Sequence, residues 1–113
     1  MPKKNGYKSL EVYNLSKKLV IACYELTHEL PADEKTNFTR YIRTAALNLH
    51  VNVAQGVFLK SKKRKKFIRE AKNALIIIDA ATEILVDLHF ATQEQIDVIT
   101  ALSSSCYQSL VQL

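Results

Sequence analysis

One short segment of this chain combines residue types that bind phosphate groups. Positions 60–66 read Lys-Ser-Lys-Lys-Arg-Lys-Lys, and two further cations follow at positions 69 and 72. Lysine and arginine neutralise the phosphates of a nucleic acid and release its counterions. A helix that begins within such a run adds free backbone N–H groups, which also bind anions. The sequence therefore predicts a nucleic-acid contact made by Lys60, Lys62, Lys63, Arg64, Lys65, Lys66, Arg69 and Lys72.

The order of charges along the chain supports a partner for this segment. Residues 60–72 hold eight Lys or Arg against one Glu, a net charge of +7, whereas residues 73–113 hold five acids and no base, a net charge of −5. Cations at the start of a helix and acids toward its end both oppose the helix dipole. The phosphates of RNA or DNA are the partner we favour, and a protein surface or a merely solvated loop remain open alternatives.

Two more arginines, Arg40 and Arg43, lie one turn apart on or next to an apolar helix face. They either extend the basic surface or pair with acids of another helix, because arginine serves both roles. We therefore count both among the candidate nucleic-acid-binding residues.

The residues that could support catalysis or bind a metal do not form a complete site. Glu25 and His28 have the E-x-x-H spacing of di-iron bundles, but that site needs a second such motif and two further Glu residues. Cys23 and Cys106 lie on apolar stripes and are expected to be buried, inert thiols. We predict a protein that is not an enzyme, with no metal site and no cofactor.

The tyrosines are expected to pack rather than to bind bases. Tyr13, Tyr24 and Tyr41 fall on or beside apolar stripes, which favours packing in the core or at its rim. Tyr7 lies near the N-terminus and is compatible with either role.

Few turn-forming residues are available to divide the chain into many short elements. It has 113 residues with 2 Gly and 2 Pro, and nothing after Gly56 is either. This scarcity argues against β-sandwiches and α/β folds, which need frequent turns. Apolar residues instead recur at helical spacing over about 9–29, 33–59, 61–88 and from 92 onward. Ser9 is the expected N-cap of the first helix, and Thr92 with Gln95 forms a capping box for the fourth.

Short connections make sequential helices antiparallel neighbours, so we predict an all-α, up-down-up-down four-helix bundle. The whole chain, 1–113, forms one domain with a polar N-terminal tail at 1–8. Its N-terminus lacks the apolar stretch of a signal peptide, and no uncharged segment is long enough to span a bilayer. A cytoplasmic protein without a membrane partner is the expectation.

Several stretches resemble the four-helix-bundle protein family that includes the proteins encoded in intervening sequences of 23S ribosomal RNA genes. The resemblance covers about residues 7 to 110 and rests on Tyr7-Lys-Ser-Leu-Glu-Val-Tyr13, Leu30-Pro31 with Glu34, Ile42-Arg43-Thr44-Ala45-Ala46 and Asn52-Val53-Ala54-Gln55-Gly56. The segment Phe67-Ile-Arg-Glu-Ala71 and the apolar third helix are more similar to a relative, the accessory variability determinant of diversity-generating retroelements.

The resemblance implies a homopentamer of bundles with a basic surface that binds nucleic acid. For the retroelement branch it also implies a reverse transcriptase as partner and a role in mutagenic cDNA synthesis. The alternatives are a 23S rRNA intervening-sequence protein, or a protein–protein scaffold that binds no nucleic acid. The scaffold is suggested by the several apolar faces of the third helix and by the acidic half at 73–113.

Overall fold

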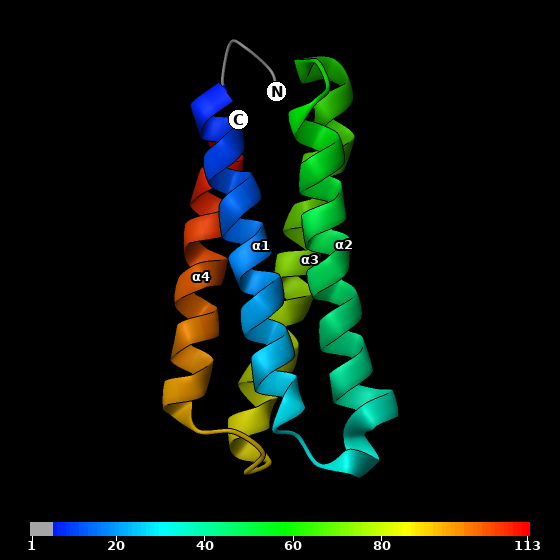
Figure 1. Ribbon diagram of the computed structural model, residues 1–113, viewed down its shortest axis with the longest axis vertical. Helices are drawn as coiled ribbons and strands as arrows, with labels where there is room; N and C mark the ends of the chain where they lie inside the picture. The colour runs from blue at the N-terminus through cyan, green and yellow to red at the C-terminus, as the bar shows by residue number, and fades with distance from the viewer. Residues whose placement is uncertain (1–5) are drawn as a thin grey trace.

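Four α-helices make up the fold, which is known from a computed structural model that describes residues 6–113. They are α1 (Gly6–His28), α2 (Arg40–Val57), α3 (Ser61–Asp87) and α4 (Gln93–Val111), and the described residues contain no β-strand. The molecule measures 45 × 24 × 17 Å, with all four helices along its longest dimension (Figure 1). The prediction of a four-helix, all-α fold is confirmed. Residues 1–5 of the expected tail lie outside the described part, and residues 6–8 already belong to α1.

The helices pack as a closed ring of neighbours. Helix α2 makes its most extensive contact with α3, and α1 lies between α2 and α4. Helix α4 closes the ring against α3. In Figure 1 the colour of the chain runs down α1, up α2, down α3 and up α4. The starts of α1 and α3 and the ends of α2 and α4 therefore share one end of the molecule.

The predicted apolar stripes form the core. Helix α2 buries its stripe at Ile42, Ala45, Leu49, Val53 and Gly56. The other helices face it with fully buried aliphatic side chains, namely Leu19, Ile78, Leu85, Ile99 and Leu110. Removing these side chains from water is the main favourable contribution to folding, at about 25 cal/mol for each Å² of apolar surface.

The start of α1 differs from the prediction. Ser9 is not an N-cap, because the chain is already helical at Gly6 and Ser9 lies within the second turn. Its side chain is completely buried, and Oγ has no hydrogen-bond partner among the described residues. A serine suits either an N-cap or a tightly packed helix face. At Ser9 the packing of α1 against its neighbours places the residue on the buried face.

The chain before α2 is wound less regularly than predicted. A 3₁₀ turn at Ala32–Glu34 and a π-helical turn at Lys35–Thr39 occupy the first part of the expected helix 33–59. A π turn holds one residue more per turn than an α-helix, so it changes the direction of the side chains around it. Here Thr39 becomes buried while Phe38 stays half-buried beside the core.

The connection between α3 and α4 combines a predicted and an unpredicted feature. Gln95 N–H donates to Thr92 Oγ1 over 3.2 Å, and Thr92 N–H donates to Gln95 Oε1 over 2.9 Å, which confirms the capping box. Just before it, His89 has a φ of 61°, in the left-handed region where glycine is normally found. The turn is closed by Phe90 N–H, which donates to Leu85 C=O over 2.9 Å.

We predict that His89→Gly raises the stability of the fold. Glycine removes about 1–2 kcal/mol of left-handed strain and adds about 0.5–1 kcal/mol of unfolded-state entropy. The net gain of about 0.5–1 kcal/mol corresponds to a thermal midpoint higher by roughly 2–6 °C. Thermal unfolding followed by circular dichroism measures it, with His28→Gly in the last turn of α1 as the control expected to lower the midpoint. A lower midpoint for His89→Gly would contradict the strain at this position.

Candidate nucleic-acid interface

The predicted cationic segment begins helix α3 at the end of the molecule where α2 finishes. Lys60 precedes the helix in an extended conformation, and its C=O accepts from Lys63 N–H and Arg64 N–H over 3.0 and 2.9 Å. Within the described part of the chain Lys60 gives the helix no side-chain cap, and the first turn contains no acid. The backbone donors of this turn are therefore not neutralised locally, which is favourable for binding an anion.

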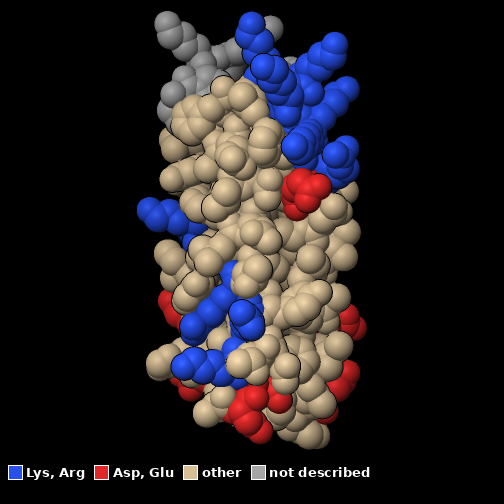
Figure 2. All heavy atoms as spheres, turned by 90° about the vertical axis from the view of Figure 1, so that its right-hand side faces the viewer, with Lys and Arg blue, Asp and Glu red and all other residues tan. Residues whose placement is uncertain are grey.

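Most of the cations in this segment face solvent. The exposed ones, which we call the cationic end, are Lys60, Lys62, Lys63, Lys65, Lys66 and Arg69. Lys72 is half-buried, with Nζ lying 5.6 Å from the centre of the Tyr107 ring on α4. Figure 2 shows Lys and Arg side chains gathered at one end of this face of the molecule.

Arg64 differs from the other cations of the run. Its side chain is only 6% exposed, and Nε donates to the Gly56 carbonyl over 3.1 Å. This carbonyl belongs to the last turn of α2, where a cation is favoured by the helix dipole. The prediction that Arg64 contacts nucleic acid does not fit this placement. Arg64 instead fixes the start of α3 to the end of α2.

Gly56 allows these two helices to come close together. A Cβ atom at this position would lie 3.2 Å from Cβ of Phe67 on α3, which is tighter than an ordinary contact. The absent side chain therefore lets α3 begin directly against α2. This close approach places Arg64 within reach of the Gly56 carbonyl and leaves its lysine neighbours outside.

The tertiary structure changes the expected conflict between charge and helix dipole. The last turns of α2 and α4 contain no basic residue of their own, and both finish at the end where α3 begins. The negative end of the α2 dipole lies against the start of α3 and reduces the cost of its cations. At the opposite end, acids such as Glu94 lie in the first turn of α4, where they are favourable.

Arg40 and Arg43 are not part of the cationic end. Both lie in the first turn of α2, at the opposite end of that helix. Arg43 Nε donates to Thr27 Oγ1 on α1 over 2.8 Å, and its guanidinium lies 4.4 Å from the centre of the Tyr24 ring. Arg43 thus joins α1 to α2 through a hydroxyl and an aromatic ring, which neither of the two expected roles describes. Arg40 is exposed.

An apolar hollow that sequence reasoning missed lies beside the cationic end. It has a volume of about 550 Å³ and is lined by His50, Val51, Ala54, Gln55, Phe58, Leu59 and Phe67. Phe58 follows the last residue of α2 and is 60% exposed. The ammonium group of Lys66 lies 5.8 Å from the centre of the Phe67 ring. The sequence feature that could have indicated this hollow is Phe58, which lies two residues before the lysine run and outside the apolar stripe of α2.

His50 is held at the edge of this hollow by contacts to α1. The Ser16 hydroxyl lies 2.8 Å from His50 Nδ1 and 2.9 Å from Tyr13 C=O, and the direction of the hydrogen bond to the imidazole depends on the tautomer of the ring. Tyr13 packs on the imidazole with ring centres 4.8 Å apart, as expected for a tyrosine at the rim of the core. Partial burial and the nearby Lys17 lower the pKa of His50, which favours the neutral ring.

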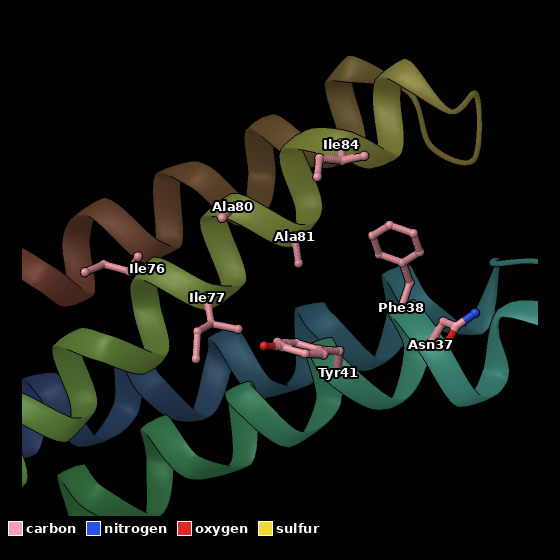
Figure 3. Close-up of a pocket in the computed structure, with 8 residues that line it drawn as sticks. All are labelled: Asn37, Phe38, Tyr41, Ile76, Ile77, Ala80, Ala81 and Ile84. Atoms are coloured by element: carbon pink, nitrogen blue, oxygen red, sulfur yellow. The ribbon is translucent and has the colours of Figure 1, made fainter.

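A second apolar surface lies on the side of the molecule. Figure 3 shows Phe38 and Tyr41 on one wall of a groove, with Ile77, Ala81 and Ile84 of α3 on the other. The groove has a volume of about 470 Å³, and all of its lining residues are uncharged. Tyr41 is 62% exposed, so the expectation that it packs into the core or its rim was wrong. The face it occupies is covered by no other helix among the described residues.

The remaining candidates for chemistry stay apart. Glu25 and His28 are both exposed, and no group of three or more His, Cys, Asp or Glu comes together within residues 6–113. Cys23 and Cys106 are completely buried free thiols, as predicted. Burial raises the pKa of each thiol to about 12, so the reactive thiolate is strongly disfavoured.

Comparison with known proteins gives one family. A family model described as 23S rRNA-intervening sequence protein matches residues 8–112, which is nearly the whole chain. A search of curated proteins gives no match. Among the described residues no helix is long and apolar enough to cross a membrane.

We predict that Arg64→Ala destabilises the fold although its neighbours tolerate the same change. The substitution removes a buried hydrogen bond to the end of α2 and the packing of the arginine stem, a loss of about 1–3 kcal/mol. Lys63→Ala and Lys65→Ala, on either side, are exposed and should change stability by less than about 0.5 kcal/mol. Urea unfolding followed by circular dichroism compares the three. Equal stability of Arg64→Ala and Lys65→Ala would contradict the structural role of Arg64.

Proposed function

The chain belongs to the family of 23S rRNA-intervening sequence proteins, and from this premise we propose that it is a non-enzymatic protein that binds RNA through its cationic end. The observation that carries the proposal is the set of five exposed lysines within seven residues, at a helix start that contains no acid. Phosphate groups are the ligands that such a surface attracts most strongly.

The arrangement of the lysines favours contacts to the backbone of RNA rather than to particular bases. Successive residues of a helix point about 100° apart, so Lys62, Lys63, Lys65 and Lys66 point in several directions from the first turns of α3. Such a spread suits a flexible chain of phosphates and does not fix one register on base edges. We therefore propose binding with little sequence preference from the lysines themselves.

The family match favours the ribosomal RNA reading over the retroelement one. Its description names 23S rRNA intervening sequences and contains no reference to a reverse transcriptase. The partnership with a reverse transcriptase and the role in cDNA synthesis stay predictions that rest on resemblance alone. The description names no binding partner, so the proposal of RNA as the partner rests on the cationic end.

We also propose that a second copy of this chain covers the apolar groove between α2 and α3. Ile76 is 65% exposed and Ile84 is 47% exposed there, and exposed apolar groups of this size mark contact surfaces. The homopentamer stays a prediction, and this face is the one that we assign to it.

We predict that replacing the five exposed lysines weakens RNA binding and its dependence on salt. The variant carries Lys60→Gln, Lys62→Gln, Lys63→Gln, Lys65→Gln and Lys66→Gln. For the parent, five phosphate contacts give a slope of log K against log[salt] of roughly −3.5 to −4.5 for each subunit. For the variant, this slope should approach zero. Fluorescence anisotropy with a labelled RNA at several salt concentrations measures both slopes.

The matched control removes charge elsewhere on the surface. Lys18→Gln, Lys35→Gln and Arg40→Gln together neutralise three exposed cations outside the cationic end. This variant should keep most of the slope of the parent. Unchanged RNA affinity in the five-lysine variant would sink the proposed function, and an equal loss in the control would reduce it to an effect of net charge.

We predict that Ile76→Asp with Ile84→Asp dissociates the assembly into monomers. The two carboxylates would be buried without partners in the interface, which costs far more than their exposure in a monomer. Light scattering on the parent and the variant gives the molar masses, and Val98→Asp on α4, at a 57% exposed position, is the control. A parent that is already monomeric would rule out both the pentamer and this interface.

A further inference from the structure

Phe58 is unusual because it exposes a large aromatic ring directly beside the lysine run. It follows the last residue of α2 and remains 60% exposed, although it lies only two residues before Lys60. The backbone here is fixed, since Leu59 N–H donates to Gly56 C=O over 3.1 Å. The ring is therefore held at the surface by a defined turn and offers a flat apolar face to solvent.

The hollow next to Phe58 has the properties of a site for a flat ring. It is open to solvent over most of its extent and largely apolar, so it can receive one face of a ring. Val51, Ala54 and Phe67 supply apolar walls, while Gln55 and His50 supply the polar groups. The imidazole of His50 and the side-chain amide of Gln55 can each form a hydrogen bond with the edge of a base.

The charges around the hollow complement a nucleic acid. Lys66 lies near the Phe67 ring at the back of the hollow, and Lys60 and Lys62 follow Phe58 along the chain. A base that enters the hollow would bring its phosphate next to these ammonium groups. An apolar protein side chain would fill the same walls but would leave the surrounding positive charge without a partner.

We propose that this hollow receives an unpaired base of single-stranded RNA, which stacks on Phe58 while the neighbouring lysines hold its phosphates. The proposal rests on the proposed function, because it gives the cationic end a preferred form of RNA. Bases within a duplex are stacked on one another and cannot enter the hollow. Aromatic platforms flanked by cations are a general solution for binding single strands, and every base can use them.

The test replaces the aromatic face and keeps the apolar volume. Phe58→Leu is compared with Phe58→Tyr, which retains a ring at the same position. The probes are a labelled oligoadenylate and an RNA duplex of equal phosphate number, measured by anisotropy at one salt concentration. A 2-aminopurine base in the single strand reports stacking through quenching of its fluorescence.

We expect Phe58→Leu to weaken binding of the single strand by about 5- to 150-fold and to abolish the quenching. Binding of the duplex should change by less than about 2-fold, because its contacts are to phosphates. Phe58→Tyr should behave as the parent does. Circular dichroism of each variant checks that the fold is kept.

Three results would overturn the proposal. Equal binding of the single strand by the parent and Phe58→Leu, with a loss in the five-lysine variant, would reject the base site and leave the proposed function intact. If Phe58→Leu lost the same affinity for the single strand and for the duplex, Phe58 would act only by positioning the lysines of the cationic end. A changed molar mass of Phe58→Leu without RNA would assign the hollow to a contact between copies. The proposed function itself is tested separately. It would be rejected if the five-lysine variant still bound RNA with the affinity of the parent.

Discussion

The close approach of α2 and α3 is the constraint on which the functional end of this molecule depends. Gly56 permits it, since a Cβ there would meet Phe67 at 3.2 Å, and Arg64 secures it by donating to the Gly56 carbonyl. With the two helices joined so tightly, the intervening turn has no room for Phe58 or the lysines to fold inward. The buried Arg64 therefore holds the start of α3 in the position from which its neighbouring lysines face solvent, and Phe67 of the same helix lines the apolar hollow.

Electrostatics set the cost of this arrangement. A cluster of lysines at a helix start repels itself and opposes the dipole of its own helix. In the bundle, the negative end of the α2 dipole lies against the start of α3 and offsets part of this cost. The remaining repulsion among the lysines favours binding of a polyanion, because phosphates that neutralise the lysines relieve this repulsion. A surface of this kind is least favourable when empty, which suits binding rather than stability.

The two apolar surfaces divide the molecule by role. The groove between α2 and α3 is uncharged and lies on the side of the bundle, and we propose that a second copy covers it (Figure 3). The hollow at Phe58 is surrounded by lysines at the end of the bundle, where an apolar partner alone would leave charge unmatched. In an assembly built through the groove, the cationic ends remain exposed and their contributions to RNA binding add together.

The sequence by itself determined the four helices, their buried stripes and the Thr92 capping box, because helical periodicity and caps are properties of residues three or four apart. It also located the cationic end, since a run of lysines is exposed almost wherever it lies. Only the tertiary structure separated Arg64 from its neighbours, gave Arg43 a hydroxyl and a ring as partners, and exposed Tyr41 and Phe58. Each of these depends on which residue of another helix lies opposite. That pairing is decided by the packing of whole helices, and no local pattern in the chain records it.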